Sequence, residues 1–367
     1  MRICLSWIGA LGVLVAGSRI AGAIPCSDPS LPGPIIVAGS SAVKPLVIEV
    51  GKALAATTPV TNTVIYQNQG SCVGVNAIVA NAPITGTALY YDKDGNELSC
   101  DLAAAGTPVD VGMSDVFVDS CTGAPPPDGV GQFSGPVEAM LFVAPKASQA
   151  TAITVDEAYF VFGFGADGMA KPWTVEANLM RRNSQSGTQG ILASNIFVPA
   201  GRWKGLDKKN SDGVLAAVIA STSADSTIGI LGSDFYDAHR DTLKALAFQG
   251  FHQYAAFYAD STATSFDKRN VRDGHYVNFG YLHLVAHVDA GGVPSTPAAK
   301  QFVDWITGNT ARTPAPAGFD IFTATVKAKL IPTCAMKVQR TSEGGLIKPF
   351  TPTTDCSAMF ESAVAPH

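Results

Sequence analysis

Three times between residues 35 and 115, a short apolar run is followed by a turn of small polar residues. The runs span residues 35–38, 63–66 and 109–113, and the turns are Gly39-Ser40-Ser41, Gln69-Gly70-Ser71 and Ser114-Asp115. After the first two turns, residues 42–56 and 73–79 carry apolar side chains at helical spacing. This repeated order of strand, turn and helix predicts an α/β fold with a parallel sheet.

The three turns are also candidates for ligand contact, because open α/β sheets bind ligands at the carboxyl ends of their strands. The polar groups expected there are Ser40, Ser41, Ser71, Ser114 and Asp115. Between the second and third units, residues 84–101 contain Asp-Gly between two short apolar pieces, which predicts an inserted hairpin that includes Cys100.

The second half of the chain predicts a further set of strands and helices. Strands are expected over residues 135–145, 178–182, 226–231, 243–248 and 276–288. Helices are expected over residues 154–162, 212–220 and 297–307, and a capping-like Thr-Val-Asp-Glu opens the first of them. Residues 120–135 are rich in Gly and Pro and are expected to be loop, and the tail from residue 332 to residue 367 is expected to be irregular.

One stretch, Arg181 to Thr188, gathers two guanidiniums, three hydroxyls and a glycine ahead of an apolar helical run. Ser186-Gly187-Thr188 is typical of a turn that opens a helix, where free N–H groups and the helix dipole favour an anion. Arg182 lies four residues before Ser186 and offers a planar fork of donors that suits a tetrahedral oxyanion. The alternative is an ordinary capped helix beside a surface arginine.

Composition narrows the possible partners. Of the 367 residues, 47% are apolar and only 15% are charged, as in a well-packed globular protein. The net charge is −5 and no basic stripe is present, which argues against nucleic acid and anionic membranes as partners. No CxxC pair occurs and the cysteine spacing does not suit a zinc site, so we expect no metal, and no cofactor is expected either. His283 and His287 could share a strand face, but no third ligand is evident, so we interpret them as structural.

The N-terminus and the cysteines both indicate export. Arg2, an apolar run to Ala16 and Ala21-Gly22-Ala23 predict a signal peptide that is cleaved after Ala23. The product would be periplasmic or secreted; lipidation of Cys26 is the alternative. Six cysteines follow the signal peptide, an even number that suggests disulfides, namely Cys26, Cys72, Cys100, Cys121, Cys334 and Cys356. Cys334–Cys356 is the first expected pair, and the other four allow three pairings.

Four of these motifs occur in the order found in the periplasmic phosphate-binding proteins of ABC-type phosphate uptake, and the chain resembles that family. They are Gly39-Ser40-Ser41-Ala42, Gln69-Gly70-Ser71, Val111-Gly112-Met113-Ser114-Asp115 and Arg182-x3-Ser186-Gly187-Thr188. The resemblance extends from about Ile35 to about Gly308.

The resemblance implies a fold and its division. The fold would be a two-lobed α/β clamp of the type II periplasmic-binding-protein class, with two mixed sheets flanked by helices and joined by two crossover strands. After the signal peptide (1–23), lobe I would comprise residues 24–143 plus 278–367, and lobe II residues 144–277. Closure would be a hinge motion near Ala144 and near Asn278.

The resemblance also implies a role for each residue of the site. From lobe I, Ser41 and the N–H of Ala42 would donate to phosphate, as would Ser71, while Asp115 would accept the proton of the bound phosphate. From lobe II, Arg182 would pair with phosphate oxygens. The hydroxyl and N–H groups that would surround the anion belong to Ser186, Gly187 and Thr188. Ser40 is a neighbour without an assigned role.

Asp115 has a physical rationale independent of the resemblance. A carboxylate that faces an anion repels it unless the ligand supplies a proton, and hydrogen phosphate does so whereas sulfate does not. The alternative is that Asp115 is a helix cap. One departure concerns Ser184, because family members often carry an acidic residue there, two positions after the arginine, that fixes the guanidinium. The insertion and the cysteine-tied tail also depart from the family and indicate a specialised extracellular relative.

We therefore expect an exported, monomeric solute-binding protein that captures inorganic phosphate and performs no covalent chemistry. An ABC-type permease as partner is implied by the resemblance alone. One alternative is an extracellular surface or adhesion protein on the same fold, and another is a binder of a different oxyanion. A phosphatase-like hydrolase that uses Ser41 or Ser186 is a third alternative, but the sequence places no general base beside either serine.

Overall fold

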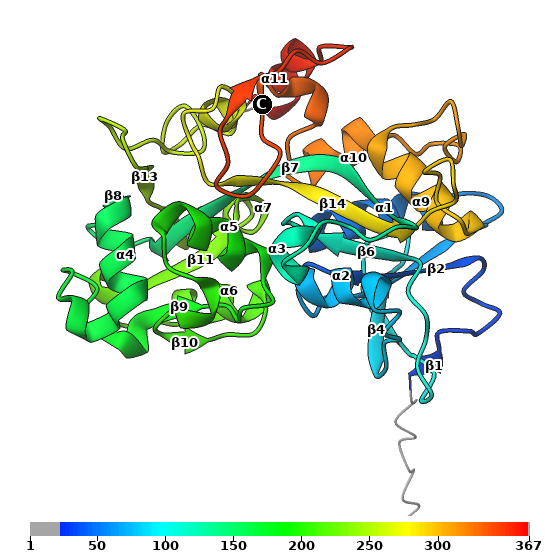
Figure 1. The fold of residues 1–367 in the computed structure, drawn as a ribbon, viewed down its shortest axis with the longest axis horizontal. Helices are drawn as coiled ribbons and strands as arrows, with labels where there is room; N and C mark the ends of the chain where they lie inside the picture. The colour runs from blue at the N-terminus through cyan, green and yellow to red at the C-terminus, as the bar shows by residue number, and fades with distance from the viewer. Residues whose placement is uncertain (1–22, 366–367) are drawn as a thin grey trace, which may run out of the picture.

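A computed structural model describes residues 23–365 as an α/β protein built on a twelve-stranded mixed sheet (Figure 1). The strands follow one another in the order β1 (Ile24–Pro25), β5 (Glu97–Asp101), β4 (Thr87–Tyr91), β3 (Thr63–Gln67), β2 (Pro34–Gly39), β6 (Val111–Ser114), β14 (Phe279–His287), β7 (Val130–Pro145), β11 (Ile228–Gly232), β9 (Leu179–Arg181) and β10 (Leu206–Asp207). β12 (Leu243–Ala245) also pairs with β7. Two small sheets pair β8 (Ala152–Thr154) with β13 (Ala247–Gln249) and β15 (Val338–Gln339) with β16 (Lys348–Pro349).

The long strand β7 divides the molecule into two lobes. Its residues 130–139 pair antiparallel with β14, while residues 140–145 pair with β11 and β12. We call the part built on β1 to β6, β14 and the first part of β7 lobe I, and the part built on β8 to β13 and the end of β7 lobe II. The predicted two-lobed α/β class is confirmed, and β7 runs through the lobe I and lobe II halves of the one twelve-stranded sheet.

Helices cover both lobes (Figure 1). They are α1 (Lys44–Ala55), α2 (Ser71–Val79), α3 (Val118–Thr122), α4 (Val155–Phe164), α5 (Gly187–Ile196), α6 (Ser211–Ile219), α7 (Ser233–Asp237), α8 (Arg269–Arg272), α9 (Pro297–Thr307), α10 (Ile321–Lys327) and α11 (Ser357–Val364). In lobe I, α1 and α9 bury their apolar faces against the sheet in one core, while α2 and α3 form a separate apolar cluster with β14. The core of lobe II is continuous with the C-terminal tail through Phe360.

Local sequence chemistry explains where several elements begin. Thr154 caps α4 by accepting from the N–H of Glu157, whose side chain accepts in return from the N–H of Thr154, so the predicted capping motif is confirmed. α9 begins at Pro297 behind the cap Thr296, as expected for a helix with proline in its first turn. In lobe I, β2 pairs parallel with both β3 and β6, which confirms the predicted parallel arrangement.

Three expectations are corrected. β7 begins at Val130, inside the stretch that was expected to be loop, because pairing with β14 extends the strand beyond its apolar part. The expected strand over 243–248 is two strands, β12 and β13, with different partners. The tail is not wholly irregular, since it contains η5 (Thr333–Ala335), β15, β16 and α11.

Three disulfides tie the chain. Cys334–Cys356 was the expected first pair and is confirmed, and the other two pairs are Cys26–Cys100 and Cys72–Cys121. Cys26 is therefore disulfide-bonded in the structure, which argues against its lipidation. Cys100 lies on the predicted hairpin, whose strands β4 and β5 pair antiparallel, and the bond fixes this hairpin to the segment that contains β1 and Cys26. The predicted signal peptide lies outside the described residues except for Ala23.

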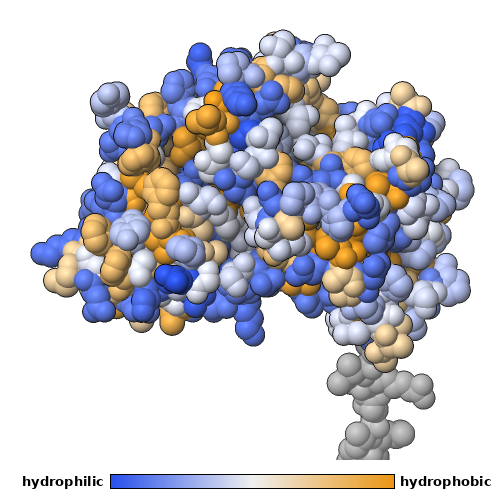
Figure 2. All heavy atoms as spheres, in the orientation of Figure 1, coloured by the Kyte–Doolittle hydropathy of each residue, from blue (hydrophilic) through white to orange (hydrophobic). Residues whose placement is uncertain are grey.

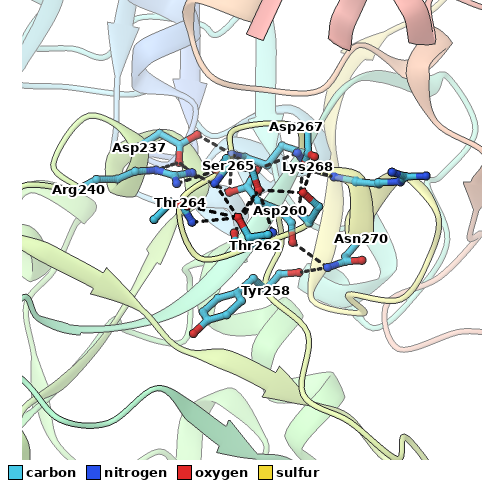
Figure 3. A network of polar contacts seen from close by, with 12 residues as sticks. Asp237, Arg240, Tyr258, Asp260, Thr262, Thr264, Ser265, Asp267, Lys268 and Asn270 are labelled. Atoms are coloured by element: carbon cyan, nitrogen blue, oxygen red, sulfur yellow. Dashed lines mark hydrogen bonds and ion pairs between the residues drawn. The ribbon is translucent and has the colours of Figure 1, made fainter. Parts of the chain in front are cut away.

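Lobe II contains a buried group of four charged side chains, which we call the ionic cluster: Asp237, Arg240, Asp260 and Lys268 (Figure 3). Lys268 Nζ lies 2.6 Å from Asp237 Oδ2 and 3.1 Å from Asp260 Oδ1. Arg240 Nη2 lies 2.6 Å from Asp260 Oδ2 and also contacts Asp237. Two cations thus neutralise two carboxylates, and each charge has a partner of opposite sign.

The surface in the view of Figure 1 is mixed, with apolar patches set among hydrophilic side chains (Figure 2). Among residues 23–365, none of the helices has the length and apolar character needed to cross a bilayer.

Candidate functional site

The residues predicted to contact a ligand meet where the two lobes face each other. Ser40 and Ser41 follow β2, Ser71 opens α2 and Asp115 follows β6. From lobe II, Arg182 follows β9 and Ser186 caps α5. All nine predicted residues are buried: Ser40, Ser41, Ala42, Ser71, Asp115, Arg182, Ser186, Gly187 and Thr188. We call this set the interlobe site.

Asp115 lies at the centre of the lobe I side. Ser40 Oγ donates to Asp115 Oδ2 over 2.6 Å, and Ser71 Oγ donates to the same oxygen over 3.2 Å. Asp115 Oδ1 is buried and has no hydrogen-bond partner among the described residues. Burial raises the pKa of Asp115, and the hydroxyl of Ser40, the charge of Arg182, the hydroxyl of Ser71 and the nearby N–H of Thr188 oppose that rise. The carboxyl group thus keeps one acceptor position free.

Ser40 also organises the loop around it. The N–H of Ala42 donates to Ser40 Oγ over 3.0 Å, and Tyr66 donates its hydroxyl to the Ser40 carbonyl. This gives Ser40 the role that the sequence left unassigned: it links the first turn to Asp115.

The amino end of α5 approaches lobe I closely. The N–H of Gly187 donates to Ser71 Oγ over 3.2 Å, and the N–H of Cys72 donates to the carbonyl of Gln185 over 3.1 Å. A Cβ on Gly187 would stand 2.4 Å from Ser71 Oγ and 2.8 Å from Asp115, so glycine is required for this approach. Thr188 Oγ1 is buried and has no partner among the described residues. The helix start therefore presents N–H donors to Ser71 and Asp115, and Thr188 adds a buried hydroxyl to the same site.

Ser186 acts as the cap of α5. Its side chain accepts from the N–H of Gln189 over 3.3 Å, as the turn-before-helix pattern predicts. Gln189 in turn accepts from the N–H of Arg182 over 2.9 Å. The cap and the arginine are thereby held in a fixed relation.

Arg182 is 2% exposed and is held by neutral oxygens. Its Nε donates to the carbonyl of Lys209 over 3.0 Å, and its Nη1 donates to Ser211 Oγ over 3.1 Å. No carboxylate of residues 23–365 lies within 4 Å of it, and burial lowers the pKa of Arg182 to about 10, against the opposing charge of Asp115. The guanidinium therefore carries a buried positive charge without an ion-pair partner.

Ser184 replaces the acidic residue that often fixes the arginine in the resembled family, and other residues hold Arg182 here. Ser184 is exposed, and the residues that fix the guanidinium are Lys209 and Ser211 from the start of α6. Ser211 also reaches lobe I, because its Oγ lies 3.1 Å from Ser41 Oγ and its N–H donates to Ser41 Oγ over 3.2 Å. Sequence reasoning recognised the helix start at Asp212-Gly213 but missed that Ser211 belongs to the interlobe site.

Two residues with alternative interpretations take structural positions. Cys72, in a Gly-x-Cys-x-Gly sequence that resembles a nucleophile turn, is bonded to Cys121. His283 is fully buried, with its ring 4.2 Å from that of Phe117, and burial lowers its pKa to about 3. Among residues 23–365, the histidine, cysteine and acidic side chains form no group of three that is suited to a metal ion.

The interlobe site contains the kinds of group that suit an anion carrying a proton. It offers a buried guanidinium, a helix start and several hydroxyls as donors, together with one carboxyl oxygen as acceptor.

Comparison with known proteins places the fold. The first similar structure is described as a putative phosphate ABC transporter substrate-binding protein with bound phosphate from Clostridium perfringens; it is 14% identical, with a TM-score of 0.55, and the match covers 82% of this chain and 100% of that one. An ABC-type phosphate transport receptor from Vibrio cholerae is 15% identical over 81% of this chain and 99% of that one, with a TM-score of 0.49. A human phosphate binding apolipoprotein is 16% identical over 81% of this chain and 90% of that one, also with a TM-score of 0.49.

The fold assignment rests on the first of these structures. This chain has its two-lobed α/β fold, as the fold class predicted from the sequence requires. At this level of identity the likeness concerns the fold alone. No family model matches the sequence, and no curated protein matches it.

Proposed function

We propose that this protein captures hydrogen phosphate between its two lobes, with the interlobe site as the binding site. One observation carries the proposal: Arg182 from lobe II and the free Oδ1 of Asp115 from lobe I lie buried in the same site. A buried guanidinium without a carboxylate partner favours an anion. A buried carboxyl oxygen without a donor favours a ligand that supplies a proton.

The two features together select one kind of oxyanion. Hydrogen phosphate presents acceptor oxygens to Arg182 and Thr188, and its P–OH donates to Asp115. Sulfate at neutral pH has no proton, so its oxygen would face the Asp115 carboxylate without a hydrogen bond. Such a mismatch costs about 1–3 kcal/mol, or more for a charged group.

Phosphate capture would use the contacts that now join the lobes directly. Ser71 and Gly187 hydrogen-bond to each other across the interface, as do Cys72 and Gln185. Opening would release these donors to a phosphate, and closure would be a hinge motion near Ala144 and near Asn278. In this proposal lobe I comprises residues 24–143 plus 278–367, and lobe II residues 144–277.

The cellular setting follows the same proposal. The protein would be exported after cleavage near Ala23, act in the periplasm or outside the cell as a monomer, and deliver phosphate to an ABC-type permease. The similar structure from Clostridium perfringens has phosphate bound, which supports phosphate as the ligand.

Catalysis has weaker support than binding. Ser41 Oγ contacts Ser211, and Ser186 Oγ accepts from the N–H of Gln189. Among the described residues, neither hydroxyl has a histidine or carboxylate as its hydrogen-bond partner, so neither has a general base. The surface-protein alternative and the binding of another oxyanion are decided by the test below.

The test is equilibrium dialysis of the desalted, refolding-checked protein against radiolabelled phosphate, with and without excess sulfate. We expect one phosphate per chain, displaced by unlabelled phosphate and retained in excess sulfate. Displacement by sulfate would favour a general oxyanion binder. An absence of bound label, after endogenous ligand has been removed, would overturn the proposal and favour the surface-protein alternative.

A further inference from the structure

Two further carboxyl groups lie where β7 passes from lobe I to lobe II. Glu138 is on β7, and Asp234 follows β11 in the first turn of α7. Both are buried, at 3% and 1% exposure. A Cβ on Gly232 would stand 1.6 Å from Glu138 Oε1 and 2.6 Å from Asp234 Oδ1, so the two carboxyl groups share the space that a side chain at this glycine would fill.

The surroundings of this pair provide little compensation for negative charge. Asp234 Oδ1 accepts from the N–H of Phe235 over 2.7 Å. Apart from the contact between the two carboxyl groups themselves, both oxygens of Glu138 and Asp234 Oδ2 lack donors among residues 23–365, and no cation of these residues lies within 4 Å of either group. Two adjacent buried carboxylates without a cation cannot both be ionised, so the pair must retain a proton.

The charges on the neighbouring elements act mainly in the same direction. Burial is the main cause that raises the pKa of Glu138 well above its usual range. The charges of Asp234 and of Asp115, which follows β6, add to the rise. Burial raises the pKa of Asp234 to about 8; hydrogen bonds with Glu138 and with the N–H of Phe235 oppose the rise, and the charges of Asp115 and Asp237 add to it. The charge of Arg182, which follows β9, opposes this rise in the pKa of Glu138. The nearby Ser233 and Asn278 are polar but uncharged.

The sheet register places Glu138 on the same face of the sheet as the interlobe site. Glu138 pairs with Gly280 of β14, and cross-strand partners share a face of the sheet. A Cβ on Gly280 would stand 2.6 Å from the carbonyl oxygen of Asp115 and 2.4 Å from Ile191 of α5. Glu138 is therefore on the face of the sheet that supports Asp115 and α5.

We propose that Glu138 and Asp234 form a proton-binding site that sets the affinity of the interlobe site for phosphate. The pair holds one proton when the lobes are closed, and loss of that proton places an additional negative charge behind the bound anion. Opening admits water to the hinge and lowers the affinity of the pair for the proton, so closure on phosphate takes up a proton. This inference rests on the proposed function.

The sign of the pH dependence follows from the raised pKa values. Below the raised pKa values of Glu138 and Asp234, the pair keeps its proton and does not repel the bound anion. As the pH rises through these pKa values, the pair ionises and disfavours closure. Phosphate affinity should therefore fall between about pH 6 and pH 8, by up to about tenfold per pH unit for one linked proton. Phosphate and Asp115 also titrate and contribute to the pH dependence of phosphate affinity. The contribution of the pair is therefore the part of this pH dependence that disappears when both members are replaced by neutral residues.

The test compares the wild type with the double variant Glu138→Gln/Asp234→Asn, which is isosteric with the protonated pair. Calorimetric titration with inorganic phosphate at pH 6, 7 and 8, in buffers of different ionisation heat, gives both the affinity and the protons taken up. We expect proton uptake at pH 7 to be lower in the double variant, and its affinity to depend less on pH. Asp94→Asn, at an exposed turn, is the matched control and should titrate as the wild type does.

Two outcomes separate this inference from the proposed function. If the wild type binds phosphate and the double variant shows the same proton uptake and pH profile, the proton site is overturned while phosphate capture stands. If neither protein binds phosphate, the proposed function fails and this inference with it. Infrared spectroscopy gives an independent readout, because the wild type at pH 7 should show a protonated carboxyl band that the double variant lacks. The absence of that band in the wild type would also overturn the inference.

Discussion

The ionic cluster of lobe II and the interlobe site both bury charge, but they do so in opposite ways. In the ionic cluster, Lys268 contacts Asp237 and Asp260, so that the buried cation faces two carboxylates (Figure 3). In the interlobe site, Arg182 contacts only neutral oxygens, and Asp115 keeps one oxygen without a donor. The first arrangement is complete within the protein, whereas the second, under the proposed function, would be completed by an anion that carries a proton.

The comparison shows that the pairing of buried charges, more than their burial, distinguishes a structural cluster from a candidate binding site. A buried ion pair that is complete becomes costly only when one partner is removed. A buried charge without a partner already carries a desolvation cost in the folded protein, and a ligand of opposite charge offsets that cost. The two regions should therefore respond differently to the same kind of substitution.

The largest effect on stability is expected from Lys268→Met. The substitution removes the cation between Asp237 and Asp260 while keeping an unbranched side chain, and it leaves the two buried carboxylates with Arg240 alone. The free energy of unfolding should fall by about 3–5 kcal/mol, measured by urea denaturation at neutral pH. Lys93→Met, at an exposed site, should change it by less than about 0.5 kcal/mol. A loss no larger than that of the control would show that the ionic cluster is not a stabilising unit.

Arg182→Met should have the opposite effect to Lys268→Met, because it should weaken phosphate binding strongly and leave stability almost unchanged. Phosphate affinity should fall by about 100-fold or more, because truncating one partner of a buried charge pair costs about 2–5 kcal/mol. The free energy of unfolding should stay close to the wild-type value or rise, since the lost cation has no carboxylate within 4 Å among residues 23–365. Dialysis and urea denaturation of the same preparation measure both quantities. Strong destabilisation with unchanged phosphate binding would place Arg182 with the structural charges.

A smaller effect is expected from Gly187→Ala, which tests whether the lobes must approach closely. The added Cβ would meet Ser71 Oγ and Asp115 at 2.4 and 2.8 Å, so complete closure should be obstructed. Phosphate affinity should fall by about tenfold, a loss of about 1.4 kcal/mol that lies within the range for overpacking, while stability changes little. Gly201→Ala is the matched control, because no atom lies within 4 Å of its added Cβ. Equal affinities in the two variants would contradict the close approach.

The parts of the fold that depend on local sequence were predictable. α9 was predicted with its observed bounds because Thr296 and Pro297 mark its start and apolar residues follow at helical spacing. The start of β7 was not predictable, since Val130 lies in a Gly- and Pro-rich stretch and becomes a strand only by pairing with β14. The pairing of Cys26 with Cys100 likewise depends on how β1 lies beside β5, which spacing alone does not give.

The residues of the interlobe site also fall into those that local sequence predicts and those that depend on long-range contacts. The stretch from Arg182 to Thr188 is a local motif, and the structure brings it to Ser71 and Asp115 as the motif order suggested. Ser211 was missed because its role depends on a contact 170 residues away, with Ser41. Glu138 was visible as a single charge inside an apolar run, but its partner Asp234 is apparent only when β11 lies beside β7.

The central claim is that the free oxygen of Asp115 accepts a proton from the ligand, and the most direct measurement is calorimetric titration of the wild type and Asp115→Asn with phosphate and with sulfate. An asparagine can donate to an unprotonated oxyanion, so the variant should lose most of its preference for phosphate over sulfate, by about tenfold or more. The wild type should bind phosphate and give no heat with sulfate at the same concentration. An unchanged ratio of the two affinities in Asp115→Asn would contradict the account.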